Sequence, residues 1–467
     1  MASVRDWVWH RMEMKNIETD QRWKRLEPWK WIPIAVAGGW FLWEWVRIMV
    51  RARGDFPNHW ELGRRIVSGE YIYADNLNFV YPPFWAMAHA PLVLFGSPRV
   101  AQLVIYPFTI LWLAILIRSM IRLTRKQMPL SGKPLFWVIT AALVLAGQFV
   151  SRDLPEVGVN TMLVALSWLA VRLWSGKRDM QAGICLGFAA ALKCTPLLFI
   201  AYFALKKQWR VTFYALAALA VFTSAPMILM GPKGYQKAAS NWARGVIRGV
   251  SDPDPSRGVL GEEKVLNISL RPALARYLMH LPYGHLGRPE TSDMPGKKHD
   301  PPSRYYVDFL NLKPAIAGLV VKTVMILMVL ATAWLFRHSP SSRDDPAIVW
   351  ECATVSLLIL LISPITWKQH CVGVLPALYL VSGQMATDPK IPRWVWPVMG
   401  LYTVLAVLMN REFLGKSLMG LLDSYEVKTV AILLLTWLML TWRSWVPLHG
   451  YPPLHHSAHK SQNNKDG

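Results

Sequence analysis

Charged residues are scarce in this chain. They make up 17% of its 467 residues, whereas a soluble globular protein carries about 25%. The mean hydropathy is +0.25, and long apolar runs recur along the whole chain. The composition therefore argues against an ordinary soluble domain. It indicates membrane helices, because only helices satisfy their own backbone polar groups over such runs inside lipid.

Acidic residues are scarcer still, with 29 Asp and Glu against 51 Lys and Arg and a formal net charge of +22. In a soluble protein this excess would indicate nucleic acid. No basic run alternates with aromatic residues in a soluble segment here, so we expect no nucleic acid partner. We expect the basic residues to crowd cytoplasmic loops and to bind anionic membrane lipids.

Cysteine and the common cofactor motifs are also lacking. The four cysteines, Cys185, Cys194, Cys352 and Cys371, lie in or beside apolar runs without CxxC spacing, so neither zinc nor a disulfide framework is indicated. The chain has no Walker A loop, no GxGxxG after a strand and no HExxH. It therefore shows no motif for a P-loop, a dinucleotide or a zinc-protease site.

What the chain does have is a series of apolar runs, each near the roughly 20 residues that a helix needs to cross the hydrocarbon core. From them we expect an all-α polytopic membrane protein, a multi-helix bundle with about twelve transmembrane helices and loops at the outer face. The clearest runs are Trp31–Val50, Val100–Ile121, Val157–Trp174, Val211–Met230, Ala315–Phe336, Ala347–Ile362 and Val427–Trp442.

Composition divides the chain into five segments. Residues 1–30 are basic and amphipathic, and we expect them to lie on the cytoplasmic membrane surface, because the first apolar run is too long for a cleavable signal. Residues 31–230 and 314–447 form two transmembrane modules, separated by a large polar extracytoplasmic loop at 231–313. Residues 448–467 are predicted to be a disordered cytoplasmic tail.

Two helices are expected outside the spanning runs. Residues 57–78 carry apolar side chains at near-helical spacing, which predicts a helix lying flat in the membrane interface. Within the large loop, the stretch from Asn267 to Arg276 predicts a capped helix. The Pro-, Gly- and Asp-rich stretches on either side of it predict irregular loop.

Counting crossings from a cytoplasmic N-terminus places Asp55, the large loop and His370 on the outer face. The same count also places the basic stretches Arg118–Lys133 and Arg172–Arg178 on the outer face. That outcome contradicts the positive-inside rule.

A second arrangement removes this conflict. It has a re-entrant segment in Val80–Gly96 and a hairpin at Lys193–Pro196, which returns Lys206 to the side of Lys177. Both arrangements agree on Asp55 and His370. They differ over the side on which Asn160 and Lys193 lie.

A short polar stretch interrupts the apolar pattern directly after the first run. It begins with Gly54 and Asp55 and continues to Tyr81-Pro82-Pro83. A carboxylate here lies at the level of the lipid headgroups, where a lipid-linked substrate presents its phosphate, and it could take the proton of an attacking hydroxyl. The alternative is an interfacial Asp that pairs with Arg51 or Arg53.

Lys193 and His370 are candidates for binding that phosphate. Lys193 lies inside an apolar run, where a lysine faces a polar cavity or an anion unless it snorkels to the interface. His370 closes a turn that begins at Ser363, and its imidazole could donate to a leaving phosphate. Lys368 would add positive potential, and Trp367 could stack on a sugar ring. The alternative is a polar turn with an aromatic membrane anchor.

The remaining candidates for contact with the substrate are Tyr81, Asn160, Asn267 and Ser269. Asn and Ser are also common helix caps. No pair of carboxylates stands in the first loop, as a metal-bound nucleotide sugar would favour. The sequence therefore favours a lipid-phosphate donor. We expect no divalent metal and no other cofactor.

In their order and spacing, these residues resemble glycosyltransferase family 87, a family of polytopic membrane enzymes of the GT-C type. The resemblance spans about residues 35–385. The family pattern has an Asp-containing first loop with a later Gly and Tyr, Tyr-Pro-Pro, Pro-Leu, Gly-Gln-x-Asn, Ala-Gly, Lys-x-x-Pro, Asn-x-Ser-Leu and Ser-Pro-x-x-Trp-x-x-His. This chain matches it, with Val159 in place of Gln, at Asp55, Gly69, Tyr73, Tyr81–Pro83, Pro91-Leu92, Gly158–Asn160, Ala182-Gly183, Lys193–Pro196, Asn267–Leu270 and Ser363–His370.

The resemblance implies transfer of a hexose, mannose above all, from a polyprenyl-phosphate sugar donor to a hydroxyl of a lipid or glycan acceptor, with inversion at the anomeric carbon. It implies that Asp55 is the general base. It also implies an active site on the outer face of the inner (plasma) membrane, with both termini cytoplasmic. We expect Lys193 and His370 to contact the donor phosphate, where fixed cations stabilise developing negative charge.

Two other classes stay open at this point. A lipid flippase or sugar transporter would favour inverted repeats and broken helices near the midplane, and no internal repeat is obvious. A lipid-linked oligosaccharide ligase or polymerase would depend on Arg and His in the large loop, such as Arg271, Arg276 and His285. Substituting Asp55 separates the classes, because a flippase or ligase need not depend on it.

Overall fold

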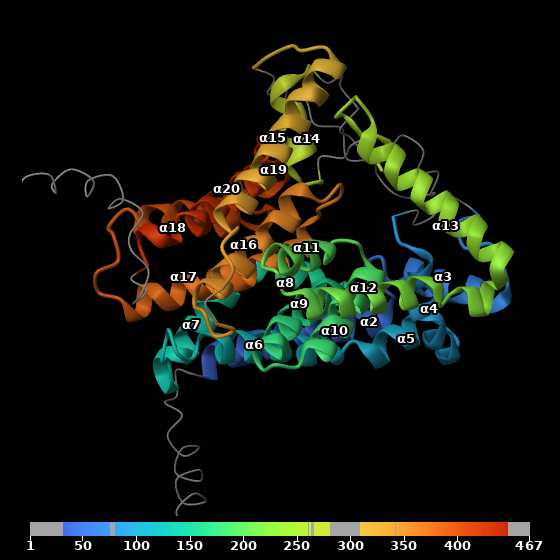
Figure 1. Cartoon of the computed structure of the whole chain (residues 1–467), viewed down its shortest axis with the longest axis horizontal. Coiled ribbons are helices and arrows are strands. Elements are labelled where there is room, and N and C mark those ends of the chain that lie inside the picture. The colour runs from blue at the N-terminus through green and yellow to red at the C-terminus, as the bar shows by residue number, and fades with distance from the viewer. Residues whose placement is uncertain are drawn as a thin grey trace, which may run out of the picture. The chain divides into compact units, whose positions relative to one another are not determined.

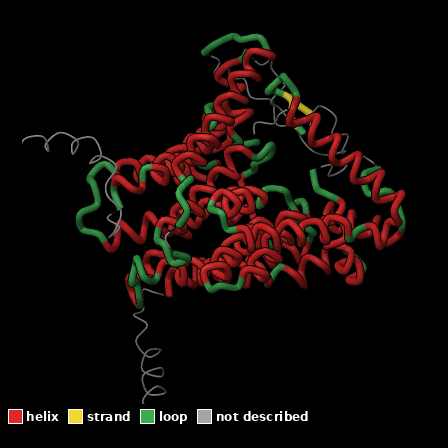
Figure 2. The backbone as a smooth tube through the Cα atoms, in the orientation of Figure 1, coloured by secondary structure: helices red, strands yellow, loops and turns green. Residues whose placement is uncertain are grey.

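The computed structural model describes residues 31–74, 80–259, 261–262, 266–280, 309–340 and 342–446. Helices dominate these residues, and the strands among them form one short hairpin (Figure 2). The all-α class that the sequence predicts is confirmed for this part of the chain. The predicted segments at 1–30 and 448–467 lie outside the described residues, and the boundaries of the five segments stay a prediction.

The chain forms two compact units, and the boundary between them follows Arg51. In the first unit the structure describes one helix, α2 (Trp31–Val50), whose bounds are those of the first apolar run. The second unit begins at Ala52 and holds every other described element (Figure 1).

The second unit is built mainly of α-helices, with a few short 3-10 helices and one strand pair between them. Its elements are α3 (Phe56–Ser68), α4 (Pro83–His89), η2 (Ala90–Phe95), α5 (Pro98–Ile105), α6 (Phe108–Thr124), α7 (Gly132–Leu145), α8 (Gly147–Asp153), η3 (Leu154–Glu156), α9 (Val159–Ser175), α10 (Asp179–Leu192), α11 (Leu197–Leu205), α12 (Trp209–Ser224), α13 (Met227–Ser251), β1 (Arg257–Gly258), β2 (Gly261–Glu262), α14 (Leu270–Leu278), α15 (Pro314–Leu335), α16 (Ala347–Ile362), η4 (Lys368–Val374), α17 (Leu375–Thr387), α18 (Val395–Thr403), the π-helical η5 (Val404–Leu408), α19 (Arg411–Ser424), α20 (Val427–Leu440) and η6 (Trp442–Ser444).

Helices α9, α10 and α12 lie side by side in the second unit (Figure 1). Two glycines allow α10 to pack closely against α12. A Cβ atom at Gly183 would lie 2.4 Å from Cβ of Tyr214, and one at Gly187 would lie 2.6 Å from the carbonyl oxygen of Ala215 and from Cβ of Ala218. This is the spacing by which small residues bring helix backbones together. Because the contacts advance along both helices in the same direction, α10 and α12 run parallel.

Replacing Gly187 with Val is therefore expected to destabilise the protein by about 2–3 kcal/mol, because the added side chain meets backbone atoms of α12. The matched control is Gly400→Val in α18, where an added Cβ has no neighbour within 4 Å. Thermal unfolding in detergent should show a clear loss of apparent Tm for Gly187→Val only. Equal losses would mean that helix propensity, and not packing, sets the effect.

Because α10 and α12 run parallel, the chain must return between them after the Lys193–Pro196 turn. The short helix α11 returns the chain, so that the start of α12 lies beside the start of α10, in a common cavity with Lys177. The chain therefore reverses after Lys193–Pro196, as the predicted hairpin requires, and Lys206 follows α11 three residues before α12 begins. The membrane side of these helix ends stays a prediction. Asn160, at the start of α9, and Lys193, at the end of α10, lie together at the opposite end.

Fewer helices than predicted meet the length and hydropathy of a full membrane span. In the described ranges, Pro98–Thr124 and Pro314–Leu335 do so. Two bent pairs also qualify if each is one span, Gly132–Leu145 with Gly147–Glu156 at 70° and Trp209–Ser224 with Met227–Ser251 at 86°. Six shorter apolar helices in the described ranges have 10–17 residues. The structure thus supports two to four long spans, and the count of about twelve crossings stays a prediction.

The predicted large loop opens with a helix. Helix α13 continues through the expected boundary at Gly231 as far as Ser251, with a break at Gly231 (φ 66°, ψ 164°). Glycine adopts this positive φ without the steric cost of a Cβ. Further along, α14 confirms the helix predicted after Asn267, although the Ser269 side chain does not cap it.

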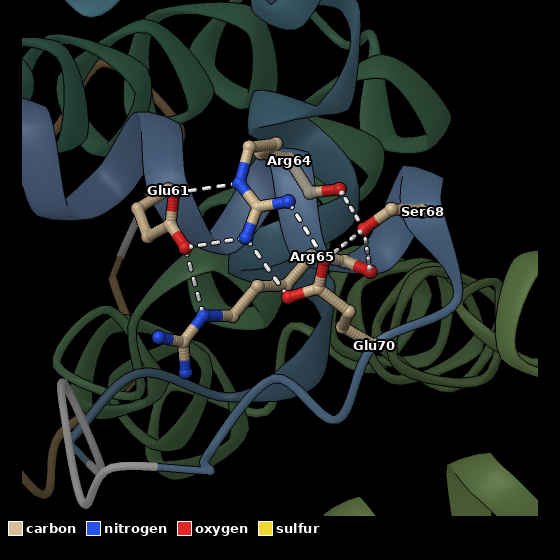
Figure 3. Close-up of polar contacts among 5 residues, drawn as sticks. All are labelled: Glu61, Arg64, Arg65, Ser68 and Glu70. Atoms are coloured by element: carbon tan, nitrogen blue, oxygen red, sulfur yellow. Dashed lines mark hydrogen bonds and ion pairs between the residues drawn. The ribbon is translucent and has the colours of Figure 1, made fainter.

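Helix α3 confirms the helix predicted after Asp55, but it ends earlier, where Gly69 takes a left-handed φ of 74°. Its second half carries the ion-pair network drawn in Figure 3. Arg64 lies between Glu61 (Nε to Oε2, 2.8 Å) and Glu70 (Nη1 to Oε1, 2.7 Å), and Arg65 Nε lies 2.9 Å from Glu61 Oε1. Because most of these groups are partly exposed, solvent screens the pairs and each adds little to stability.

Candidate active site

A buried glutamine joins the two loops that form the site. The Gln102 side chain accepts from the backbone N–H of Arg53 (2.9 Å) and donates to the carbonyl oxygens of Arg53 (2.9 Å) and Pro155 (2.7 Å). Gln102 is fully buried, so water does not compete for these bonds. The first loop and the 154–158 turn are thereby held against each other.

A second carboxylate lies beside Asp55 as a result. The backbone N–H of Asp55 donates to both carboxylate oxygens of Glu156, at 3.1 and 2.8 Å, and Glu156 is 7% exposed. Gly54, at φ 64°, leaves room for this contact, since a Cβ there would lie 2.4 Å from Glu156 Oε1. The Asp55 side chain does not cap α3. The first loop alone has no carboxylate pair, but the fold supplies one.

Asp153 organises the turn that carries Glu156. Its carboxylate accepts from the backbone N–H groups of Asn160 (3.2 Å) and Thr161 (2.9 Å), as well as from their side chains (2.8 and 2.7 Å). An acceptor at this place satisfies the free N–H groups at the start of α9. The four bonds also fix the orientation of the Asn160 amide.

Asn160 leads to the predicted phosphate ligands. Lys193 Nζ lies 3.4 Å from Asn160 Oδ1 and 3.0 Å from His370 Nε2. On the far side of the ring, His370 Nδ1 lies 3.2 Å from the carbonyl oxygen of Ile365. The charged lysine can only donate to Nε2, so the proton lies on Nδ1 and is donated to Ile365. Nδ1 then cannot also accept from the backbone N–H of Trp367, which lies 3.1 Å away. Asp153, Glu156 and Asp55 all lie within electrostatic range of Lys193.

The ring of His370 is neutral in this arrangement. Burial and the nearby charge of Lys193 hold the pKa of His370 well below its ordinary value of 6.5. The pKa of His59 in α3 is also well below that value, because of burial and of the charges of His89 and Lys193. Both imidazoles are therefore uncharged at neutral pH.

These low pKa values predict a loss of stability in acid. Below about pH 6.5 the unfolded chain binds protons that the folded protein excludes, so stability falls as the pH drops. The apparent Tm should decrease between pH 7.5 and 5.5, and less so in His370→Gln. The control is His338→Gln, at an exposed histidine. Parallel pH profiles for all three proteins would contradict this account.

Aromatic rings line the site beside Asp55. Tyr81 stacks on Trp85 with ring centroids 4.4 Å apart, and His59 meets both rings edge-on at 4.9 and 5.0 Å. Burial and the negative charges of Asp55 and Glu156 raise the pKa of Tyr81. The phenol therefore stays protonated and can donate a hydrogen bond next to the carboxylates.

A small cavity connects the cationic half of the site with the turn at 363–366. Its volume is about 50 Å³, and its polar lining includes Asn160, Lys193, Thr366 and His370. The Trp367 ring lies parallel to the His370 ring, with centroids 6.2 Å apart. In the described part of the chain, no group of three or more His, Cys, Asp or Glu residues is arranged to hold a metal ion.

The other predicted ligands lie elsewhere. Lys368 lines a separate cavity of about 10 Å³ with Asp423 and Lys428. The Asn267 amide donates to the carbonyl oxygen of Pro364 (3.0 Å) and accepts from the N–H groups of Thr366 (2.9 Å) and Ser269 (3.2 Å). Ser269 is fully buried. These contacts make Asn267 a support for the turn that carries His370.

The loop arginines that a ligase would need have structural partners. Arg271 donates to the backbone carbonyls of five residues between 249 and 257. Arg276 lies 3.4 Å from Glu426, and both are buried. His285 lies outside the described residues. The two arginines thus organise the fold around α14.

Sequence reasoning did not identify Glu156, Asp153 and Gln102. A signal was present for the two acids. The chain is poor in acidic residues, and yet Asp153-Leu-Pro-Glu156 places two of them just before Asn160, between apolar segments. No comparable signal marks Gln102, because its role depends on a contact between residues about 50 positions apart.

Two known mannosyltransferases are similar to this chain in sequence. The chain is 23% identical over 339 residues to a polyprenol-phosphate-mannose-dependent alpha-(1-2)-phosphatidylinositol mannoside mannosyltransferase of Mycobacterium tuberculosis, covering 69% of this chain and 67% of that protein. It is also 23% identical over 347 residues to a polyprenol-phosphate-mannose-dependent alpha-(1-2)-phosphatidylinositol pentamannoside mannosyltransferase of Mycolicibacterium smegmatis, covering 72% and 70%.

A family model covers more than half of the chain. The match runs over residues 79–364. It includes Glu156, Asn160 and Lys193, begins after Asp55 and ends before His370. The resemblance seen in the sequence motifs is confirmed. The chain belongs to glycosyltransferase family 87 and is a glycosyltransferase.

Proposed function

We propose that this protein transfers mannose from a polyprenyl-phosphate mannose donor to a hydroxyl of a lipid acceptor, with inversion at the anomeric carbon. One observation carries the proposal: a carboxylate pair, Asp55 with Glu156, shares a site with a lysine, Lys193, that sits at the end of an apolar helix. A base and a phosphate-binding cation are the two groups that this reaction needs. The names of the relatives support the choice of donor.

In the proposed reaction, Asp55 takes the proton of the acceptor hydroxyl. The acceptor oxygen attacks the anomeric carbon, and the bond from that carbon to the phosphate oxygen breaks. The polyprenyl phosphate leaves with the bonding electrons. Lys193 binds the phosphate and stabilises the added negative charge. No metal or other cofactor takes part.

Two residues act by positioning. Glu156 holds the backbone of Asp55 at the site. His370 accepts from Lys193 through Nε2, so we assign it the role of orienting the lysine instead of the direct donation to phosphate expected from sequence. Tyr81 and Asn160 are within the same polar site and supply donors for sugar hydroxyls. Trp367 stays our candidate for stacking on the sugar ring.

We further propose that the chain has the GT-C-type architecture with about twelve crossings, both termini in the cytoplasm and the active site at the outer face. The clustering of Asp55, Asn160, Lys193 and His370 at one end of the helices supports a single aqueous face for the chemistry. The basic stretch near Lys177 lies at the other end, as the positive-inside rule requires of a cytoplasmic face.

The test uses purified protein in nanodiscs with radiolabelled polyprenyl-phosphate mannose and a membrane-lipid extract as acceptor. We expect labelled glycolipid when the donor is polyprenyl-phosphate mannose, and none when the donor is a polyprenyl-phosphate pentose. Product from the pentose donor alone would overturn the choice of sugar. Label that crosses the bilayer of proteoliposomes without joining an acceptor would instead indicate a transporter.

A further inference from the structure

A larger cavity lies at the end of α10 that is remote from Lys193. Its volume is about 620 Å³, and its walls come from the starts of α10 and α12. Helix α10 has 14 residues, which separates this cavity from the candidate active site by about 20 Å. The lining residues, none of which has a role in the proposed transfer, are Lys177–Gln181, Trp209, Arg210, Phe213 and Tyr214.

The cavity has an excess of positive charge. Lys177, Arg178 and Arg210 are exposed, and within the described ranges their side-chain nitrogens donate no hydrogen bond. The acidic residue in the lining, Asp179, is bound through both carboxylate oxygens by Arg343, with Nη2 2.9 Å from Oδ2. Asp179 therefore does not neutralise the three cations. Asp344 also interacts with Lys177, but it is paired with Lys126 at 2.6 Å, so the cavity keeps an excess of positive charge and favours an anion.

The cavity continues into an apolar track on the surface of α12. Trp209, Phe213 and Leu216 are 64%, 67% and 51% exposed, and their spacing places them on one face of the helix. Exposed apolar side chains of this size, aligned on a helix, suit contact with a hydrocarbon chain. A free inorganic anion would make no favourable contact with these apolar side chains.

From these observations we propose that the cavity binds an anionic phospholipid. The headgroup phosphate lies among Lys177, Arg178 and Arg210, and an acyl chain lies along Trp209 and Phe213. Basic residues near a membrane surface attract anionic lipid, and the geometry here gives that attraction a defined place. The proposal is independent of the sugar donor and acceptor proposed above.

The experiment measures lipid binding to the full chain by native mass spectrometry and by thermal unfolding in detergent. The probes are phosphatidylglycerol, phosphatidylcholine and inorganic phosphate. The variants are Lys177→Gln/Arg178→Gln/Arg210→Gln and a control with the same loss of charge, Arg125→Gln/Lys390→Gln/Arg393→Gln. The control residues are exposed and lie outside the cavity.

We expect phosphatidylglycerol to raise the apparent Tm of the native protein and of the control, and its apparent affinity to fall at least tenfold in the cavity variant. Phosphatidylcholine should bind weakly to all three. Equal affinity of the two variants for phosphatidylglycerol would overturn the proposal. So would inorganic phosphate that protects as well as the lipid, because the ligand would then be a free anion.

A second variant, Trp209→Ser/Phe213→Ser, tests the acyl-chain contact without changing charge. It should also lose phosphatidylglycerol binding. If it binds the lipid as the native protein does, the apolar track has no part in the site and the proposed occupant is wrong. The unfolding temperature of each variant without lipid shows whether it has folded.

Discussion

Asp55→Asn is expected to lower kcat by about 10²–10⁴-fold, because the amide cannot take the proton of the acceptor hydroxyl. The affinity for the donor should change little, since the phosphate is assigned to Lys193 on another helix. The backbone N–H that Asp55 donates to Glu156 is retained in the variant. The fold of the site should therefore be preserved.

The measurement pairs turnover of radiolabelled donor with equilibrium binding of the same donor. Asp344→Asn is the matched control, because Asp344 is 53% exposed, pairs with Lys126 and lies outside the site. The control should keep native turnover. Native turnover in Asp55→Asn would remove Asp55 from the mechanism and reopen the ligase reading. Loss of turnover together with loss of donor binding would indicate a general disruption of the site.

Lys193→Met is expected to lower kcat/KM by about 10²–10³-fold, because it removes the cation that stabilises the leaving phosphate. Methionine fills a similar volume, so the helix end should stay packed. Lys207→Met removes an exposed lysine at the other end of α11 and should have no effect. Lys193→Arg keeps the charge but not the point contact with His370 Nε2, and it should recover part of the activity.

The two readouts separate binding from chemistry. A rise in donor Kd without a change in kcat would mean that Lys193 holds the donor equally in the ground state and the transition state. Unchanged kinetics in Lys193→Met would contradict the assignment. The lysine would then serve only to join Asn160 and His370.

The helical class could be predicted from composition, because long apolar runs leave no other way to satisfy backbone groups in lipid. Single helices followed from local patterns in the same way. The run Trp31–Val50 became α2 without change, and the stretch after Asn267 became α14. The number of spans could not be predicted equally well, because an apolar run in the sequence does not show where the chain bends. Helices α12 and α13 meet at 86°.

The site could be predicted in part. Four candidates could be identified because a polar side chain beside or inside an apolar run is costly unless it has a function: Asp55, Asn160, Lys193 and His370. The fold brings the last three into contact. Lys368 was placed with His370 because the two are close in sequence, but the 3-10 helix η4 directs Lys368 into another cavity. Glu156 could not be paired with Asp55 from sequence, because 101 positions separate them.

The bonds of Gln102 have a consequence for how the catalytic loop responds to its surroundings. An amide carries no net charge and does not titrate near neutral pH, so the tie between residues 53 and 155 does not depend on ionic strength or on proton uptake. Asp55 and Glu156 would repel each other when both are ionised, and the neutral clamp resists that repulsion. Changes of salt in the surrounding medium should therefore alter how substrates reach this protein more than how its two carboxylates are spaced.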